Sequence, residues 1–151
     1  MRVLGLVGPS NSGKTTLIER LTDRLDQRGR VATVKHLDHE PTIDTDGKDT
    51  ARHRAAGARA TYGLTEEGGW FATGAGRTIP TTLAELDGRY DYVLIEGFSD
   101  ADVPAVVLGG REHAGRTLFS APDADAVNLD DVLRELHRLD PYEPPDGSPP
   151  A

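Results

Sequence analysis

The stretch GPSNSGKTT, residues 8–16, has the residue types and spacing of a phosphate-binding loop. It fits the pattern G-x-x-x-x-G-K-[ST], with Gly8, Gly13, Lys14 and Thr15 at the fixed positions. The two glycines are expected to adopt backbone angles that other residues avoid, so that successive N–H groups converge on an anion. The following helix adds the positive end of its dipole. Lys14 is expected to reach the β- and γ-phosphates and the Thr15 hydroxyl to ligate Mg²⁺, which predicts binding of a nucleoside triphosphate.

A carboxylate that could serve this loop ends the apolar run YDYVLIEG, residues 90–97. Glu96 stands at the end of that run, where an acidic residue beside a phosphate loop orients Mg²⁺ or the attacking water. Lys14 and Glu96 are therefore the candidate catalytic residues, and Thr15 and Glu96 the candidate metal ligands. Asp91 begins the run and is expected at the far edge of the sheet. The alternative is that Glu96 merely ends a strand.

The segment VKHLDHEPTIDTDGKDT is rich in groups that bind metals or phosphates, and it follows a predicted strand. Ligands of parallel sheets bind where strands end, so this segment is expected near the phosphates. One interpretation is a switch-like loop in which Lys35 or Lys48 contacts a phosphate and a carboxylate assists Mg²⁺ through water. A second is a transition-metal site made of His36, Asp38 and His39. A third is a solvated polar loop.

The elements that must position these groups alternate between strands and helices. Such alternation predicts an α/β fold of the P-loop NTPase type, with a mostly parallel sheet flanked by helices. The expected strands cover 2–8, 30–36, 90–97, 104–110 and 116–121, with a hairpin of 59–65 and 68–74. The expected helices cover 15–29, 48–58, 81–88 and 128–139.

Composition limits the classes of partner and location. The chain of 151 residues carries a formal charge of −8 and no cysteine. Free nucleic acid and anionic membranes are therefore not expected partners, and a cytoplasmic location is expected. Residues 1–139 are predicted to form a single nucleotide-binding domain. Residues 140–151, which are rich in proline, are expected to be a disordered tail.

Together the motifs resemble one known family. GPSNSGKTTL, VKHLDHE, DTDGKDTARHRAAGA and DYVLIEGF occur in the order found in the molybdopterin-guanine dinucleotide biosynthesis protein B (MobB) family, across roughly residues 1–139. The resemblance implies a homodimer that binds GTP and Mg²⁺ and hydrolyses GTP slowly at most. It also implies a partner, the guanylyltransferase that joins GMP to molybdopterin, and help in delivering the cofactor to apo-molybdoenzymes.

The family's functional residues map onto this chain position by position. The implied residues are Gly8, Ser12, Gly13, Lys14, Thr15, Thr16, Lys35, His36, His39, Asp44, Gly47, Lys48 and Asp49, with Glu96 as the strand-end acid. Asn11, within the phosphate-loop motif, is a further candidate for nucleotide binding. Two departures weaken parts of the assignment: Asp38 precedes His39 where relatives have consecutive histidines, and Ser99 stands where relatives often have lysine.

Other functions and sites remain open from the sequence. A metal-inserting GTPase chaperone would use the His36, Asp38 and His39 cluster, and a small-molecule kinase would need an arginine-rich lid. The segment SAPDAD, residues 120–125, is a weaker candidate for holding the base. The apolar stretch WFATG, residues 70–74, is expected to pair across a two-fold axis in the homodimer.

Overall fold

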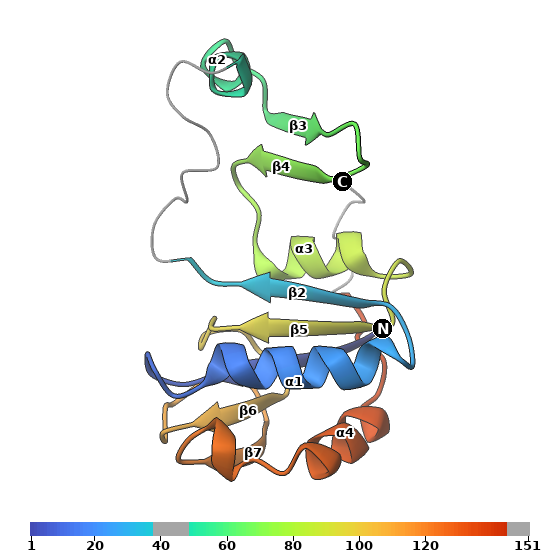
Figure 1. Cartoon of the computed structure of the whole chain (residues 1–151). Coiled ribbons are helices and arrows are strands. Elements are labelled where there is room, and N and C mark those ends of the chain that lie inside the picture. Colours follow the sequence, from blue (N-terminus) through green and yellow to red (C-terminus); the bar gives the residue numbers. More distant parts are fainter. Residues whose placement is uncertain (38–48, 145–151) are drawn as a thin grey trace. The chain divides into compact units, whose positions relative to one another are not determined.

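The structure is a computed structural model that describes residues 1–37 and 49–144. These residues form two compact units (Figure 1). Unit 1 consists of Met1–His36 and the chain from Ile79 onward, and unit 2 consists of Leu37–Thr78. Whether residues 1–139 act as the single domain expected from the sequence stays a prediction. Among the described residues, no helix is long and apolar enough to cross a membrane.

Unit 1 is built on a parallel sheet of five strands in the order β2-β5-β1-β6-β7. The strands are β1 (Arg2–Val7), β2 (Val31–Lys35), β5 (Tyr92–Glu96), β6 (Ala105–Leu108) and β7 (Thr117–Ala121). Strands β1, β5 and β6 are central and almost wholly buried, which explains why they are continuous apolar runs. Because all five are parallel, their carboxyl ends meet at one edge of the sheet.

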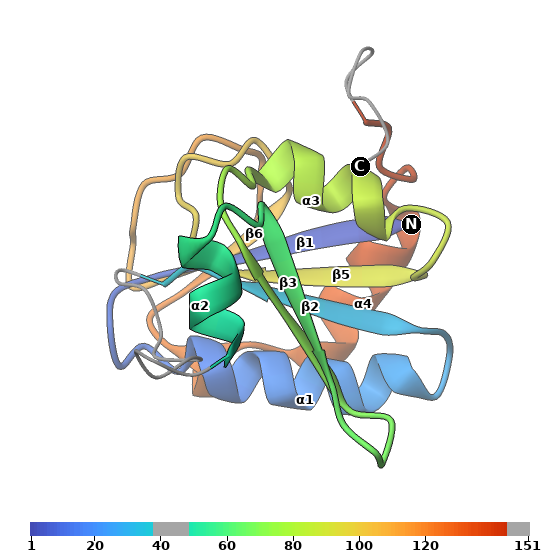
Figure 2. The same cartoon turned by 90° about the horizontal axis from the view of Figure 1, so that it is seen from above.

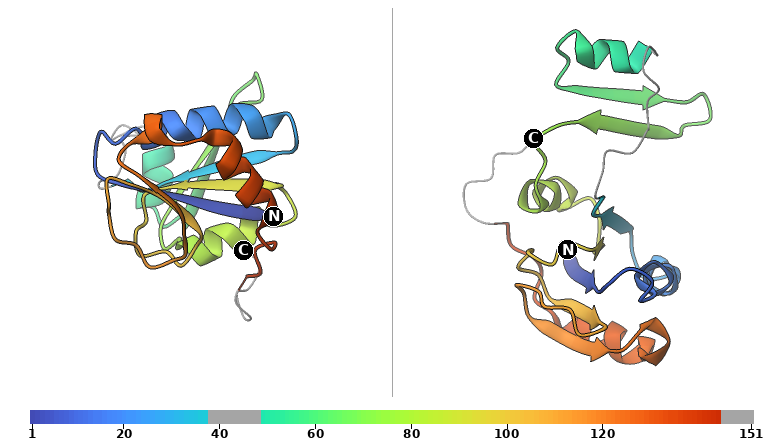
Figure 3. Two further views of the ribbon diagram at one scale, coloured as in Figure 1. Left: turned by 90° about the horizontal axis from the view of Figure 1, so that it is seen from below. Right: turned by 90° about the vertical axis from the view of Figure 1, so that its left-hand side faces the viewer.

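Helices cover both faces of this sheet, as Figure 2 and the left view of Figure 3 show. Helices α1 (Lys14–Asp26) and α4 (Leu129–Arg138) lie on one face, and α3 (Ile79–Leu86) lies on the other. Leu4 and Leu94 contribute to the core under α1 and α4, whereas Val93 contributes to the core under α3. The alternation follows from the period of two along a strand. The predicted α/β fold is therefore confirmed.

Two helices of unit 1 start at positions that the sequence marks. Helix α1 follows Gly13, whose φ of 85° lies in the left-handed region. Helix α4 follows Asn128, whose side chain accepts hydrogen bonds from the backbone N–H groups of Asp130 and Asp131.

A short 3₁₀ helix, η1 (Ala124–Ala126), was not predicted, because three residues are too few to show a period. Asp123 caps it in the same way.

Unit 2 contains a helix and a hairpin. Helix α2 (Asp49–Ala55) precedes the antiparallel strands β3 (Ala60–Leu64) and β4 (Trp70–Gly74), so the predicted hairpin is confirmed. Among the described residues of this unit, Thr61 alone is buried. Neither Trp70 nor Phe71 belongs to the buried core.

The chain after α4 returns to the sheet. The Tyr142 backbone N–H donates to the carbonyl of Met1 at 2.8 Å, and its ring packs against the core cluster that contains Val93. Five residues of the predicted tail, 140–144, are thus described. Residues 145–151 lie outside the described residues.

Candidate functional site

The phosphate-binding loop joins β1 to α1 at the carboxyl edge of the unit 1 sheet (Figure 1). The Lys14 ammonium donates to the carbonyl oxygens of Gly8 at 2.9 Å and Pro9 at 2.7 Å. The Ser12 hydroxyl donates to the same Pro9 oxygen at 2.9 Å. These bonds keep the Lys14 head within the loop, where the sequence motif predicts a bound phosphate.

The two motif glycines are needed for different reasons, which corrects one expectation. Gly13 has the predicted left-handed backbone, and a Cβ there would lie 2.6 Å from Cβ of Ala124. Gly8 is not among the residues with positive φ. A Cβ at Gly8 would instead lie 2.7 Å from Oγ of Ser12 and 2.9 Å from Cβ of Leu108. Its requirement is therefore close packing rather than backbone freedom.

Glu96 links the loop to the strand at the sheet edge. The Thr15 hydroxyl lies 3.1 Å from Oε1 of Glu96 and 3.2 Å from Oε2. The Lys35 ammonium donates to the same Oε1 at 2.9 Å. The side chain of Glu96 is 11% exposed, whereas that of Lys35 is 53% exposed. Three predicted site residues from three separate elements thus meet in one contact network.

Sheet register explains this convergence. Lys35 and Glu96 are paired residues of the parallel strands β2 and β5, and each is the last residue of its strand. Both side chains therefore project at the edge that carries the loop. Asp91 directly precedes β5 and lies at the opposite edge, as the sequence predicted, where it pairs with Arg30.

His36 and Phe98 form an aromatic contact just beyond these strand ends. Their ring centroids are 4.5 Å apart. Gly97 has a φ of 86° and Phe98 a φ of 55°, so the chain turns sharply after Glu96. A bulky residue rarely adopts a positive φ, and no sequence signal predicted it at Phe98. The contact holds the start of the segment that follows β2 against the residues that follow β5.

The segment after β7 lies against the other side of the loop. The Ala124 backbone N–H donates to the carbonyl of Ser12 at 3.1 Å. Asp123, one of the two acids considered for base recognition, uses Oδ1 to accept the N–H groups of Asp125 and Ala126. Asp125, the other, forms an ion pair with Arg20 at 3.1 Å. The sequence identified the segment but not its contact with the loop.

The donor set beside the loop fits a hard divalent cation. Mg²⁺ prefers oxygen ligands, and it is held in nucleotide sites by one or two protein oxygens together with phosphates and water. Thr15 supplies a hydroxyl and Glu96 a carboxylate at this point. When bound, such an ion would supply positive charge to the phosphates. The remaining predicted loop residues of unit 1, Asn11 and Thr16, are both exposed, and Asn11 has a positive φ of 66°.

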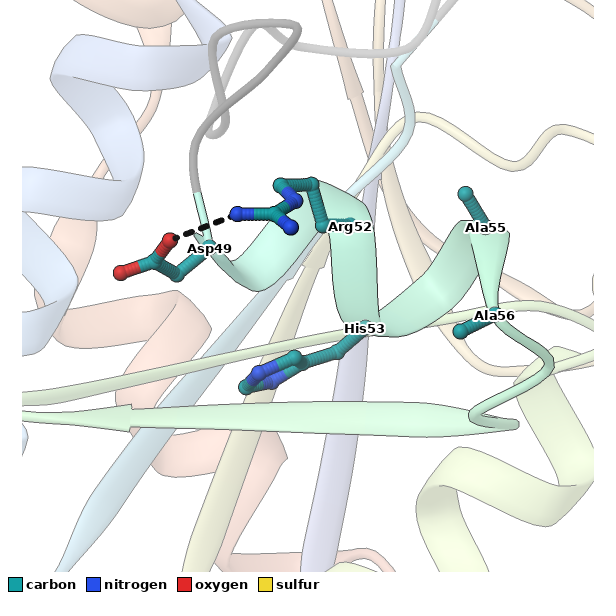
Figure 4. A pocket seen from close by; sticks show the side chains of 5 residues that line it. All are labelled: Asp49, Arg52, His53, Ala55 and Ala56. Atoms are coloured by element: carbon teal, nitrogen blue, oxygen red, sulfur yellow. Dashed lines mark ion pairs between the residues drawn. The ribbon is translucent and has the colours of Figure 1, made fainter.

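Several predicted residues belong to unit 2 or lie outside the described residues. Asp49 begins α2 in unit 2 and forms an ion pair with Arg52 at 3.8 Å, at a surface hollow also lined by His53 (Figure 4). His39, Asp44 and Lys48 lie outside the described residues.

The transition-metal alternative needs Asp38 and His39, which also lie outside the described residues. Within residues 1–37 and 49–144, no group of three or more metal-ligating side chains is gathered. That alternative therefore stays a prediction.

The sequence matches one family model and several named proteins. The family model of molybdopterin guanine dinucleotide synthesis protein B (MobB) matches residues 3–130. A Bacillus subtilis protein named "Probable molybdopterin-guanine dinucleotide biosynthesis adapter protein" is 40% identical, over 89% of this chain and 92% of its own length. A Haloferax volcanii protein named "Probable molybdopterin synthase" is 39% identical over 94% of this chain, but the chain spans only 49% of that protein.

The fold matches solved structures of the same family. The crystal structure of Bacillus subtilis MobB aligns with a TM-score of 0.62 and 32% identity, and the alignment covers 89% of this chain and 98% of that one. A MobB homolog from Bacillus stearothermophilus aligns with a TM-score of 0.63 at 22% identity, which supports the fold alone.

Proposed function

The chain belongs to the molybdopterin guanine dinucleotide synthesis protein B (MobB) family, and on that premise we propose that it is a GTP-binding adapter. The family acts in molybdenum cofactor biosynthesis, and relatives are named adapter proteins of molybdopterin-guanine dinucleotide biosynthesis. The proposed partner is the guanylyltransferase that joins GMP to molybdopterin, with apo-molybdoenzymes as later recipients. The adapter is proposed to act in the cytoplasm and to hydrolyse GTP slowly.

The observation that carries the nucleotide part of this proposal is the Thr15–Glu96 contact beside the phosphate loop. The hydroxyl and the carboxylate lie 3.1 Å apart although 81 residues separate them in the chain. Lys14 lies within the loop and supplies the compact charge that phosphate sites use. Thr15 and Glu96 are proposed to hold Mg²⁺, and the loop N–H groups to hold the phosphates.

The homodimer is proposed because unit 2 exposes apolar side chains. Within residues 1–37 and 49–144, the large apolar side chains with high exposure all belong to this unit: Leu37, Tyr62, Leu64, Trp70 and Phe71. Tyr62, Leu64 and Trp70 lie on one face of the β3–β4 hairpin, because residues of one face alternate along a strand and Leu64 pairs with Trp70. An apolar face of this kind marks an interaction site. A second copy of the chain is proposed to cover it.

The adapter role is tested by nucleotide-dependent binding to a molybdopterin guanylyltransferase. Calorimetric titration with GTP, GDP or no nucleotide should give the tightest association with GTP. The variants Lys48→Ala and Asp49→Ala should keep most of the GTP affinity and lose the nucleotide-dependent part of the association, if the segment after β2 reports the nucleotide to the partner. Asp49 begins α2, so circular dichroism must first show that its variant folds.

Two outcomes would count against this role. If the wild type does not bind the guanylyltransferase in any nucleotide state, the chain is not its adapter. If both variants bind it as well as the wild type does, the segment after β2 is only a connection and does not transmit the nucleotide state.

A further inference from the structure

The Lys35 ammonium occupies the position beside Glu96 that a cation is expected to take. It lies 2.9 Å from Oε1 of Glu96, the same oxygen that faces the Thr15 hydroxyl at 3.1 Å. A nearly buried carboxylate needs a positive partner, and Lys35 provides it. A divalent cation held by the same carboxylate and hydroxyl would repel this ammonium, because two positive charges would then share one oxygen.

Of the two partners, Lys35 is the one that is free to move. Its side chain is 53% exposed, whereas Glu96 is 11% exposed and lies in a strand that is buried along its whole length. A lysine head on a flexible four-carbon stem can change its contacts without moving the backbone. The phosphate loop is adjacent, since Thr15 follows Lys14 directly.

We propose that Lys35 distinguishes a nucleoside triphosphate from a diphosphate at this site. The inference rests on the proposed nucleotide binding and goes beyond it. Lys35 gives up its carboxylate partner when the nucleotide is bound and donates instead to the terminal phosphate of a triphosphate. A diphosphate offers no such phosphate, so the ammonium gains no new partner. Lys35, the last residue of β2, therefore responds to the presence of the γ-phosphate.

A purely structural role is the competing explanation, and the same two strands supply its control. Arg30 pairs with Asp91 at 3.3 Å where β2 and β5 begin, at the edge opposite the phosphate loop. The Lys35 pair joins the last residues of β2 and β5, and the Arg30 pair joins the residues just before these strands, but only the Lys35 pair contacts a residue of the phosphate-loop motif. A purely structural role predicts that Lys35→Gln, like Arg30→Gln, changes stability without changing the ratio of the affinities for the two nucleotides.

The test measures affinities of wild type and variants for GDP and for a non-hydrolysable GTP analogue, both with Mg²⁺, by calorimetry. Lys35→Gln should weaken analogue binding about tenfold and GDP binding much less, because one charge-assisted hydrogen bond is lost with the analogue alone. Lys35→Arg should recover part of the difference, and Arg30→Gln should leave both affinities unchanged. Thermal unfolding of each variant checks that it is folded.

A second measurement follows the Lys35 side chain by NMR in the protein without a substitution. The chain has just three lysines, Lys14, Lys35 and Lys48, so reductive ¹³C-methylation gives few NMR signals besides the N-terminal amine. The Lys35 signal, assigned by its absence in Lys35→Arg, should shift with the GTP analogue and differ from its position with GDP. The same Lys35 position with both nucleotides would overturn the proposal.

The calorimetric outcomes distinguish failure of the proposed discrimination by Lys35 from failure of the proposed nucleotide binding. If the wild type binds both nucleotides and Lys35→Gln leaves their ratio unchanged, the discrimination by Lys35 is wrong and the nucleotide site stands. If the wild type binds neither nucleotide, the proposed function fails and this inference fails with it.

Discussion

Unit 1 and unit 2 differ in what they bury. The buried apolar residues of the described chain all belong to unit 1, where they form two clusters on the two faces of the parallel sheet. In unit 2 the described residues bury only Thr61, while Leu64 is 80% exposed and Trp70 is 63% exposed. A unit that leaves its largest side chains in solvent has not completed its own core. The difference supports a division of roles, in which the proposed nucleotide site belongs to unit 1 and the apolar face of unit 2 is proposed to meet a second copy of the chain.

The largest expected effect is the difference in stability between truncating a leucine in unit 1 and truncating one in unit 2. Leu94→Ala removes a fully buried side chain from β5 and should lower the free energy of unfolding by about 2–5 kcal/mol. Leu64→Ala makes the same change in unit 2 and should alter that free energy by less than about 0.5 kcal/mol. Urea denaturation followed by circular dichroism, at low protein concentration, measures both. Equal losses would show that unit 2 has a core of its own.

A pair of glycine substitutions sharpens the comparison at the backbone level. Gly13 in unit 1 and Gly76 in unit 2 have φ values of 85° and 83°, but only Gly13 has neighbours within 4 Å of an added Cβ. Both alanine variants carry backbone strain of about 1–3 kcal/mol. Gly13→Ala adds a collision with Ala124, so it should destabilise more and abolish nucleotide binding. Calorimetry that finds nucleotide binding intact in Gly13→Ala would refute the tight loop geometry.

The exposed face of unit 2 should control assembly. Leu64→Asp places a charge on the apolar face and should raise the dimer dissociation constant at least tenfold, or about 1.4 kcal/mol. Sedimentation should give about twice the chain mass of 16.2 kDa for the wild type and the chain mass for the variant. Glu66→Ala, in the turn between the strands of the hairpin, serves as the control. A wild type that remains monomeric at tens of micromolar would contradict the homodimer.

The smallest expected effect concerns pH and the Arg30–Asp91 pair. The Arg30 backbone N–H donates to Asp91 at 2.8 Å and lowers the pKa of that carboxyl, with the Arg30 side chain adding to the effect. The folded pKa lies below the unfolded one, so the stabilisation is present above about pH 4 and is lost as the pH falls through the folded pKa. Asp91→Asn should therefore destabilise at neutral pH and converge with the wild type in acid. Asp49→Asn removes an exposed carboxylate whose partner Arg52 lies 3.8 Å away, and it should change the free energy of unfolding little at neutral pH.

Much of unit 1 could be predicted because its signals are local. The apolar run that ends at Glu96 indicated a buried strand, and Leu17, Ile18, Leu21 and Leu25 showed the period of a helix. The loop motif itself located Lys14 and Thr15. These patterns depend on residues close together in the sequence, so a single chain is enough to recognise them.

The remaining features depend on contacts between distant residues. The pairing of Lys35 with Glu96 requires that β2 lie beside β5, and no local pattern states the strand order. The positive φ of Phe98 accompanies its contact with the His36 ring, and the packing of Gly8 depends on Leu108. The hairpin of unit 2 was predicted from alternation, but its exposure was not, because apolar residues in a strand indicate burial without saying which surface provides it.

The most direct test of the account is calorimetric titration of GTP with Mg²⁺ into the wild type and Lys14→Ala. The account predicts one binding site per chain in the wild type and at least a hundredfold loss in the variant, because the loop would lose its charge-assisted contact with the phosphates. Arg28→Ala, beyond the other end of α1, should bind as the wild type does. Equal GTP affinity of the wild type and Lys14→Ala would contradict the claim that the loop of unit 1 binds a nucleotide.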